Sequence, residues 1–334
     1  MNTEFPIDFV VTWVNMNDNI WKANFSKYAS DDFDKNSLSD ARFRDYGLLK
    51  YWFRGVEKFA PWVNKIHFIC NENTPEWLNI HNPKLNIVKH TDFIPREYLP
   101  TFNSVVIERY MHRIKDLTEH FVYFNDDFYI IRPVSIDRFF RSGLPCDISI
   151  FQYNPSWSQW YVTIKNNIRI INKHFNKRTI LKRDYTKWFS DEYGNLRLHN
   201  RFFQFYNKFI TLRIPHNAQP YLKSTFHDVW AHESDILLST SGNRFRASTD
   251  LTPELFRTWQ ICQGNFEPYN TYKDTKMFPL MIKSKQAIEA IKQQKYTLVC
   301  LNDNIKISNY DETMRRICEA FDVILPEKSS FETY

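Results

Sequence analysis

Glycine is scarce in this sequence, with six residues among 334, whereas average proteins contain about 7%. Neither a GxGxxG nor a GxxxxGKS/T pattern occurs anywhere in the chain. Both patterns hold phosphate groups on glycine backbone amides, so the sequence excludes a dinucleotide-binding fold of that kind and a P-loop. A protein of this composition that handles phosphate must use side chains, helix N-termini and a metal ion.

Long apolar runs are absent as well. No stretch reaches the roughly 18–20 residues that a membrane-spanning helix requires, and residues 1–6 lack the basic and apolar regions of a signal peptide. We therefore expect a cytoplasmic protein. The formal charge of +6 is mild and suits an anionic ligand or an anionic lipid surface, so peripheral association at the inner face of the membrane stays open. The chain has no long run of Lys and Arg, so nothing in the sequence indicates nucleic acid as a partner.

The cysteines are few and widely spaced, and no CxxC pattern occurs. The odd number and wide spacing argue against a zinc ribbon and a disulfide scaffold. We expect reduced, mostly buried thiols at Cys70, Cys146, Cys262, Cys300 and Cys318.

Strand and helix patterns alternate along the first 130 residues. Apolar runs predict strands at 7–14, 65–70, 85–90 and 121–124, and helical spacing predicts helices over 46–59 and after Asn103 or Ser104. This alternation favours an α/β fold with a doubly wound, mostly parallel sheet. A further strand is expected at 298–302, followed by a helix in which Met314, Ile317 and Phe321 share a face.

The aromatic-rich stretch over 135–212 predicts a largely helical insertion or lid. The chain would thus divide into an α/β half at 1–134, the insertion at 135–212 and a segment at 213–334 that completes the α/β domain.

Polar side chains follow the expected strands at the point where each strand ends. Ligands bind at the carboxyl ends of parallel strands, and one of these ends carries Asn125-Asp126-Asp127. Adjacent carboxylates suit a hard divalent cation such as Mg²⁺ or Mn²⁺. The alternative is a solvated turn, which Asn and Asp also favour. Asp303 ends the strand at 298–302 and could complete the metal shell or form an Asx turn.

The helix that begins at Asn103 or Ser104 offers free N–H groups to an anion. Glu108, His112 and Lys115 share one of its faces, and we expect that face to be solvated.

Two further side chains can carry chemistry. His216 can take a proton from a hydroxyl near neutral pH, and Arg246 can clamp phosphate oxygens. Spacing alone does not select His216 over His174, His199, His227 and His232. Aromatic side chains that could stack on sugar rings, or else pack in the core, are Trp157, Trp160 and Tyr161.

Several segments, in this order, resemble the Stealth family of bacterial capsular-polysaccharide phosphotransferases, which is similar to the phosphotransferase that tags lysosomal enzymes in animals. The resemblance rests on IDFVVTWVNMND (7–18), the segments over 41–78 and 99–130 that include LPTFNS and FNDD, PHNAQPYL (215–222), FRASTDLTPELF (245–256) and LVCLNDNIKI (298–307).

The resemblance implies a Rossmann-like sheet of the glycosyltransferase-A type, a nucleotide-sugar donor, a divalent cation and transfer of a sugar 1-phosphate to an oligosaccharide or polysaccharide acceptor. It places the catalytic residues at Glu108, Asp127, His216 and Arg246. Donor binding is expected at Trp13, Val14, Asn15, Arg42, Asn103 and Ser104, and metal binding at Asp126, Asp127 and Asp303. Association with the capsule assembly machinery is a further option.

Two alternatives remain at this point. One is a conventional metal-dependent glycosyltransferase, which would release UDP in place of UMP. The other is a glycan-binding module without catalytic activity.

Overall fold

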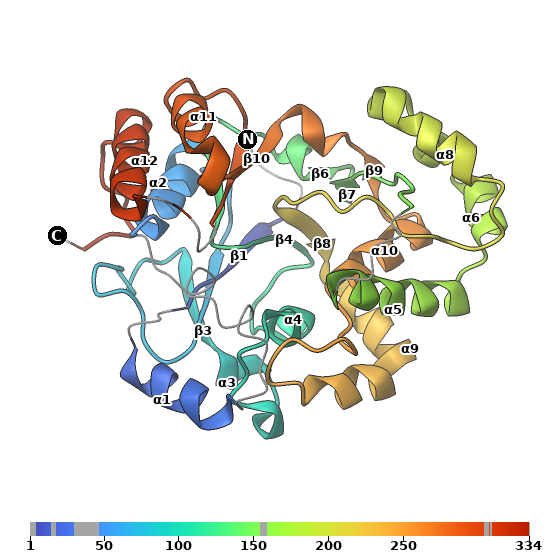
Figure 1. Cartoon of the computed structure of the whole chain (residues 1–334), viewed down its shortest axis with the longest axis horizontal. Helices are drawn as coiled ribbons and strands as arrows, with labels where there is room; N and C mark the ends of the chain where they lie inside the picture. The colour runs from blue at the N-terminus through green and yellow to red at the C-terminus, as the bar shows by residue number, and fades with distance from the viewer. Residues whose placement is uncertain are drawn as a thin grey trace.

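A five-stranded sheet forms the centre of the molecule (Figure 1). The computed structural model describes residues 5–14, 18–29, 47–153, 159–303, 307 and 309–333. The strands lie in the order β3 (Leu85–Lys89), β2 (Ile66–Cys70), β1 (Ile7–Thr12), β4 (His120–Phe124) and β8 (Gln219–Leu222). The first four run parallel, and β8 runs antiparallel to β4. The mostly parallel, doubly wound α/β sheet expected from the sequence is confirmed.

Strand β1 is buried on both faces of this sheet. Its side chains alternate between two apolar cores, with Phe9 and Val11 in one and Val10 in the other. This burial explains why the strand reads as a continuous apolar run in the sequence. The first core is closed by α2 (Leu49–Phe59), α11 (Leu280–Lys292) and α12 (Tyr310–Ile324), and the second by α5 (Gln159–His174), α9 (Lys223–Ser241) and α10 (Glu254–Gln263).

Two smaller sheets flank the large one. The strands β10 (Thr275–Pro279) and β11 (Leu298–Asn302) run parallel, and β5 (Phe128–Ile130) is antiparallel to β11. The segment 125–127 therefore joins β4 of the large sheet to β5 of this one. The other sheet contains β6 (Phe140–Arg141), β7 (Leu144–Asp147) and β9 (Glu267–Pro268).

The helix α2 approaches β5 closely at Gly55. A Cβ atom at this position would lie 2.7 Å from the carbonyl oxygen of Ile130. Only glycine allows this contact without movement of the backbone. One of the few glycines in the chain thus fixes the strand that follows Asp127.

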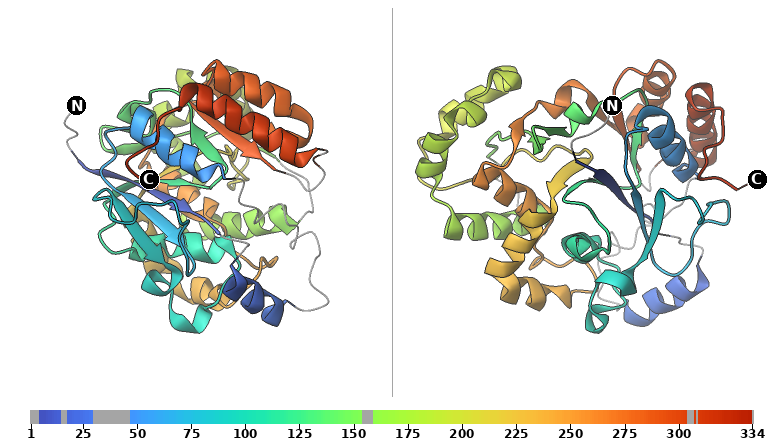
Figure 2. Two further views of the ribbon diagram at one scale, coloured as in Figure 1. Left: turned by 90° about the vertical axis from the view of Figure 1, so that its left-hand side faces the viewer. Right: turned by 180° about the vertical axis from the view of Figure 1, so that it is seen from behind.

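The sequence predicts a largely helical stretch over 135–212, but its first part contains the strands β6 and β7. The segment 159–203 within that stretch is mostly helical, and α5 is followed by a chain of short helices (Figure 2). It does not form a core of its own, because Ile171, Ile180 and Trp188 belong to the second core together with α9 and α10. The remaining α-helices are α1 (Asn19–Tyr28), α3 (His90–Phe93), α4 (Ser104–Arg109), α6 (Lys177–Arg183), α7 (Tyr185–Trp188) and α8 (Arg197–Phe203). The 3-10 helices are Arg96–Tyr98, Met111–Arg113, Ile136–Arg138, Asp191–Leu196 and Thr271–Lys273.

The region after Asn103 differs from the expected single helix. The α-helix ends at Arg109 and a 3-10 helix follows. The expectation of a solvated face at Glu108, His112 and Lys115 is wrong for the first two, which are 8% and 4% exposed. The reason is tertiary: the rings of His112 and of Phe226 on α9 stack with centroids 5.9 Å apart, and Glu108 lies against Tyr123 of β4.

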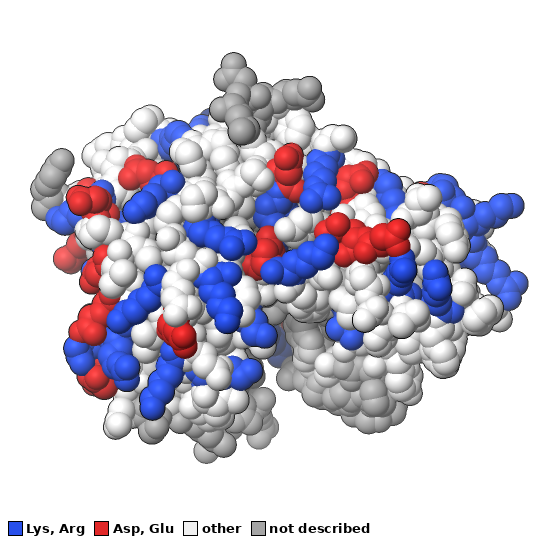
Figure 3. Space-filling model, turned by 90° about the horizontal axis from the view of Figure 1, so that it is seen from above, with Lys and Arg blue, Asp and Glu red and all other residues white. Residues whose placement is uncertain are grey.

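All five cysteines are free thiols, and four of them are buried, as the spacing predicts. Among the described residues, no helix combines the length and hydropathy that crossing a bilayer requires. On the face shown in Figure 3, basic and acidic side chains are mixed over most of the surface, and Lys and Arg gather at one end.

Candidate active site

One cavity of about 450 Å³ is lined by several segments from different parts of the chain. Ser104 and Glu108 come from α4, His216 from the loop before β8, Arg246 from the loop after α9, and Glu254 from the start of α10. Further lining residues are Val105, Asn125, Gln152, Trp160, Tyr161, Ile164, Thr211, Leu212, Ile214 and Pro253. Of the histidines that the sequence left open, those at 174, 199, 227 and 232 do not line this cavity.

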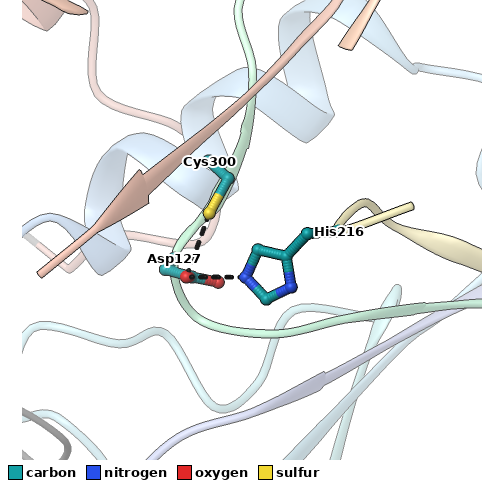
Figure 4. Close-up of side chains that lie close together, drawn as sticks. All are labelled: Asp127, His216 and Cys300. Atoms are coloured by element: carbon teal, nitrogen blue, oxygen red, sulfur yellow. Dashed lines mark hydrogen bonds and ion pairs between the residues drawn. The ribbon is translucent and has the colours of Figure 1, made fainter. Parts of the chain in front are cut away.

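His216 faces the carboxylate of Asp127 (Figure 4). Its Nε2 lies 3.6 Å from Oδ2 of Asp127, and the thiol of Cys300 on β11 donates to the same oxygen at 3.1 Å. Burial acts to lower the pKa of His216, but the neighbouring Asp127 outweighs it, so the pKa is raised above its usual value. An imidazole next to a carboxylate binds a proton more readily than a free imidazole and can also donate it to another group.

Asp127 owes its position to the junction between the two sheets. Its carbonyl oxygen accepts a hydrogen bond from Leu301 N at 2.9 Å, which ties the turn 125–127 to β11. Its Oδ1 is buried and accepts no hydrogen bond from any residue that the structure describes. A buried carboxylate oxygen without a hydrogen bond destabilises the fold, because its lost hydration is not replaced, unless a cation or a water molecule binds to it.

Glu108 is the most strongly perturbed acid of the cavity. Burial raises its pKa to about 7, the negative charge of Glu254 adds to this effect, and Arg246 and hydrogen bonds from Ser104 and Tyr123 oppose it. The carboxyl is therefore poised to gain or lose a proton near neutral pH. The hydroxyl groups of Tyr123 and Thr12 lie 3.2 Å apart, which links Glu108 to the end of β1.

Arg246 is exposed and reaches α4, where its Nη2 donates to Ser104 Oγ at 2.8 Å. Asn103 lies behind this contact and is fully buried. Its amide donates to the carbonyl oxygens of Asn243 (3.1 Å) and Phe245 (3.2 Å) and to Asp250 Oδ2 (2.9 Å). Asn103 therefore holds the loop that carries Arg246, and its side chain does not line the cavity.

The other described residues expected to bind donor or metal do not line this cavity. Trp13 is 7% exposed and packs beside Phe68, and Val14 is half-buried. Asp126 is exposed, and Asp303 is half-buried directly after β11. Asn15 and Arg42 lie outside the described residues. Asp18, near the end of β1, accepts a hydrogen bond from Asn73 after β2 at 2.9 Å, so these two strand ends do meet at one edge.

Sequence reasoning did not identify Glu254, Tyr123 or Cys300 as part of the site. None of them stands in a short motif with a chemical signature. Glu254 opens a helix, where an acidic residue is common for reasons of capping and dipole, and Tyr123 and Cys300 look like ordinary strand residues. Their roles depend on contacts with residues at least 15 positions away in the sequence.

Among the described residues, one group could hold a metal ion by proximity, with ligand atoms of Asp127, His216 and Cys300 within 4.8 Å of one another. Burial raises the pKa of the Cys300 thiol well above its usual value. A protonated thiol is a poor ligand for Mg²⁺, which prefers oxygen. The unsatisfied Oδ1 of Asp127, by contrast, fits a hard cation.

Residues 42–146 match the family described as Stealth protein CR2, conserved region 2. The similarity to bacterial relatives extends over nearly the whole chain. It is 41% identical to the capsular polysaccharide phosphotransferase WcwK of Streptococcus pneumoniae, with 98% of each chain covered. The chain belongs to the Stealth family.

Other members of the Stealth family match over nearly their whole length. The receptor polysaccharide phosphotransferase WefC of Streptococcus gordonii is 38% identical, with 98% of each chain covered. The exopolysaccharide phosphotransferase cps2G of Lactiplantibacillus plantarum is 35% identical, with 98% of this chain and 96% of the relative covered. The resemblance that the motifs indicate is thereby confirmed.

Among solved structures, a galactosyltransferase, LgtC, in complex with donor and acceptor sugar analogues, aligns over 95% of this chain and 96% of its own, with 7% identity and a TM-score of 0.42.

Proposed function

We propose that the protein transfers hexose 1-phosphate or N-acetylhexosamine 1-phosphate from a nucleotide sugar, with a UDP-sugar as first candidate, to a hydroxyl of an acceptor glycan in capsular or cell-surface polysaccharide synthesis. The acceptor oxygen forms a bond to the phosphorus that carries the sugar, and the bond between that phosphorus and the bridging oxygen breaks. The products are a phosphodiester and a nucleoside monophosphate. The observation that carries the proposal is the convergence of Glu108, His216 and Arg246 on one cavity, together with relatives named polysaccharide phosphotransferases.

His216 is the first choice for the base that removes the proton of the acceptor hydroxyl. A general base must reach its proton and have a pKa near the working pH. The contact with Asp127 supports this role, because a carboxylate next to an imidazole stabilises the imidazolium that forms when the proton arrives. Glu108 orients the hydroxyl or serves as the base in place of His216, since burial raises the pKa of Glu108 to about 7.

Arg246 would hold the equatorial oxygens of the transferred phosphate. Its contact with Ser104 and the support of its loop by Asn103 keep the guanidinium at the cavity. Phosphoryl transfer depends mainly on positioning and charge stabilisation, and a fixed guanidinium provides both.

Asp127, with Asp126 and Asp303, would hold Mg²⁺ or Mn²⁺. The unsatisfied Oδ1 of Asp127 supports this assignment. When bound, the cation would neutralise negative charge on the diphosphate. Trp13, Val14, Asn15, Arg42 and Ser104 remain the residues proposed for donor binding, with Asn103 as a support for the Arg246 loop.

The cavity also receives Trp160, Tyr161 and Ile164 from α5. Aromatic rings at a cavity wall suit the apolar faces of sugars. This supports a domain division in which the segment 135–212 contributes the acceptor side, between a donor- and metal-binding half at 1–134 and a catalytic part at 213–334.

The test is incubation of the protein with nucleotide sugars, Mg²⁺ and a short oligosaccharide, followed by phosphorus NMR of the product and identification of the released nucleotide. A phosphodiester with nucleoside monophosphate is expected. Release of UDP would indicate a conventional glycosyltransferase, and glycan binding without turnover would indicate a binding module. Either result would reject the proposal.

A further inference from the structure

One arm of the molecule carries most of its net charge. This basic arm, residues 177–208, contains eight Lys and Arg and three Asp and Glu, a net charge of +5 against +6 for the whole chain. The arm comprises α6, α7 and α8, and α6 and α8 lie at the periphery, away from the five-stranded sheet (Figures 1 and 2). Figure 3 shows Lys and Arg gathered at this end of the molecule.

The outer face of α8 is apolar, the reverse of an ordinary surface helix. Leu198 and Phe202 lie one turn apart on α8 and therefore share a face of the helix, and Phe205 follows two residues after the helix ends. They are 56%, 65% and 80% exposed, and the neighbouring Tyr206 is 49% exposed. Asn200, on the opposite side, is fully buried. The helix buries the side-chain amide of Asn200 and leaves Leu198 and Phe202 in solvent. These two exposed apolar side chains therefore do not stabilise the fold by burial.

Buried hydrogen bonds fix this orientation. The amide of Asn200 donates to the carbonyl oxygens of Ser149 at 2.7 Å and Trp188 at 2.5 Å, and accepts from Phe151 N at 2.8 Å. On the other side, the ammonium of Lys177 is 1% exposed and donates to Tyr206 O at 2.9 Å. The backbone is thus held from inside, and the apolar side chains are presented outward by a rigid support.

Exposed cations lie on α6 and on or just after α8, the helix that carries Leu198 and Phe202. Arg178 and Lys182 lie one turn apart on α6, and Arg201 and Lys208 lie on or just after α8. Arg178 Nη2 donates to Asn207 Oδ1 at 2.6 Å, which brings α6 beside the aromatic residues. Within the described part of the chain, none of these four cations forms an ion pair with a carboxylate, whereas Arg183, Lys187 and Arg197 do.

We propose that the basic arm docks the protein on an anionic lipid membrane. Exposed aromatic and aliphatic side chains next to exposed Lys and Arg match the boundary between lipid headgroups and acyl chains, where apolar insertion and attraction to anionic lipid add together. A second copy of the chain would bring the same positive charge to the face, so charge complementarity favours lipid over self-association. The cavity-lining helix α5 directly precedes the arm, so docking would hold the active site near the membrane surface.

The test is co-sedimentation of the full chain with vesicles of pure phosphatidylcholine and vesicles of equal parts phosphatidylcholine and phosphatidylglycerol. We expect binding only to the anionic vesicles, weakened by added salt. Phe202→Ser with Phe205→Ser should lower the partition coefficient about tenfold or more, and Lys182→Gln with Arg201→Gln should lower it about fivefold for each charge removed.

The matched control is Ile282→Ser with Val323→Ser, which removes two apolar side chains of similar exposure, 68% and 61%, outside the arm. These variants should bind vesicles like the wild type. All three double variants should keep wild-type turnover of a short acceptor, because none of the changed residues lines the cavity. Absence of binding to anionic vesicles, or equal binding by the Phe202/Phe205 variant, overturns the proposal. Loss of a dimer in that variant, without any lipid binding, would assign the arm to a second copy of the chain and overturn it as well.

Discussion

The imidazole of His216 and the carboxylate of Asp127 lie 3.6 Å apart, although the two residues are 89 positions apart in the sequence. His216 stands in a loop before β8 and its side chain is 44% exposed, while Asp127 lies at the junction of two sheets and is held by Cys300. The imidazole of His216 is open to the cavity, and the carboxylate of Asp127 is held in place by the core. This arrangement allows a proton to enter from the cavity and a rigid carboxylate to stabilise it.

Replacing His216 by Ala should lower turnover about 10²- to 10⁴-fold, the usual contribution of general acid–base catalysis. Because the side chain is exposed, the unfolding temperature should change little. Release of nucleoside monophosphate and a thermal melt measure the two effects. His232→Ala is the matched control, since His232 also contacts an aspartate, Asp228, at 3.3 Å but lies outside the cavity. Wild-type turnover in His216→Ala would remove this residue from the mechanism.

Replacing Glu108 by Gln should make the free energy of unfolding less dependent on pH. The folded-state pKa of about 7 lies above the usual value of 4.5, so between these values the folded state binds more protons than the unfolded state. The free energy of unfolding should therefore fall as the pH rises through this window, by an amount on the order of 3 kcal/mol. Urea unfolding at pH 5 and pH 8 should show this loss in the wild type and a much smaller one in Glu108→Gln. Glu119→Gln, at an exposed site, should behave like the wild type.

Replacing Glu254 by Gln should shift the acid limb of the pH–activity profile to lower pH. The negative charge of Glu254 raises the pKa of Glu108, and its removal relieves that repulsion. The pH dependence of kcat/KM measures the shift. Glu267→Gln, half-buried but outside the cavity, is the control. An unchanged profile in Glu254→Gln would show that the two carboxyls are not coupled in the working enzyme.

Removal of divalent cations by a chelator should abolish turnover without unfolding the protein, and Mg²⁺ or Mn²⁺ should restore it. Asp127→Asn should lose this response, whereas Cys300→Ser should keep it, because serine can still donate to Asp127 and the thiol is not expected to be a ligand. Turnover that persists in the chelator would contradict the metal assignment. Loss of metal response in Cys300→Ser would instead make the thiol a ligand.

Breaking the buried pair of Arg257 and Asp147 should destabilise the fold by about 3–5 kcal/mol, since the remaining charge would be left unpaired in the core. Their side chains are 2% and 1% exposed, with Nη2 2.7 Å from Oδ1. Urea unfolding of Asp147→Ala measures the loss. The double variant Asp147→Leu with Arg257→Met should recover much of it. A double variant as unstable as the single one would mean that the pair is worth more than an apolar replacement.

The sequence by itself determined the main strands and helices and the set of side chains that could carry out the chemistry. The apolar runs predicted as strands at 7–14 and 121–124 form β1 (Ile7–Thr12) and β4 (His120–Phe124), because a strand inside a sheet buries apolar side chains on both faces. The turn residues Asn125 to Asp127 follow the second strand. The scarcity of glycine excluded phosphate loops. The order of the motifs identified the family and pointed to Glu108, Asp127, His216 and Arg246.

Only the tertiary structure decided which of these side chains meet and in what environment. Glu108 lies on a face that looks solvated along the helix, yet the surrounding helices bury it and raise its pKa. Asn103 stands where an anion could bind, yet it supports a loop 140 residues later in the sequence. Glu254 and Cys300 carry no motif at all. Burial and electrostatic coupling depend on distances between remote segments, and local patterns do not encode those distances.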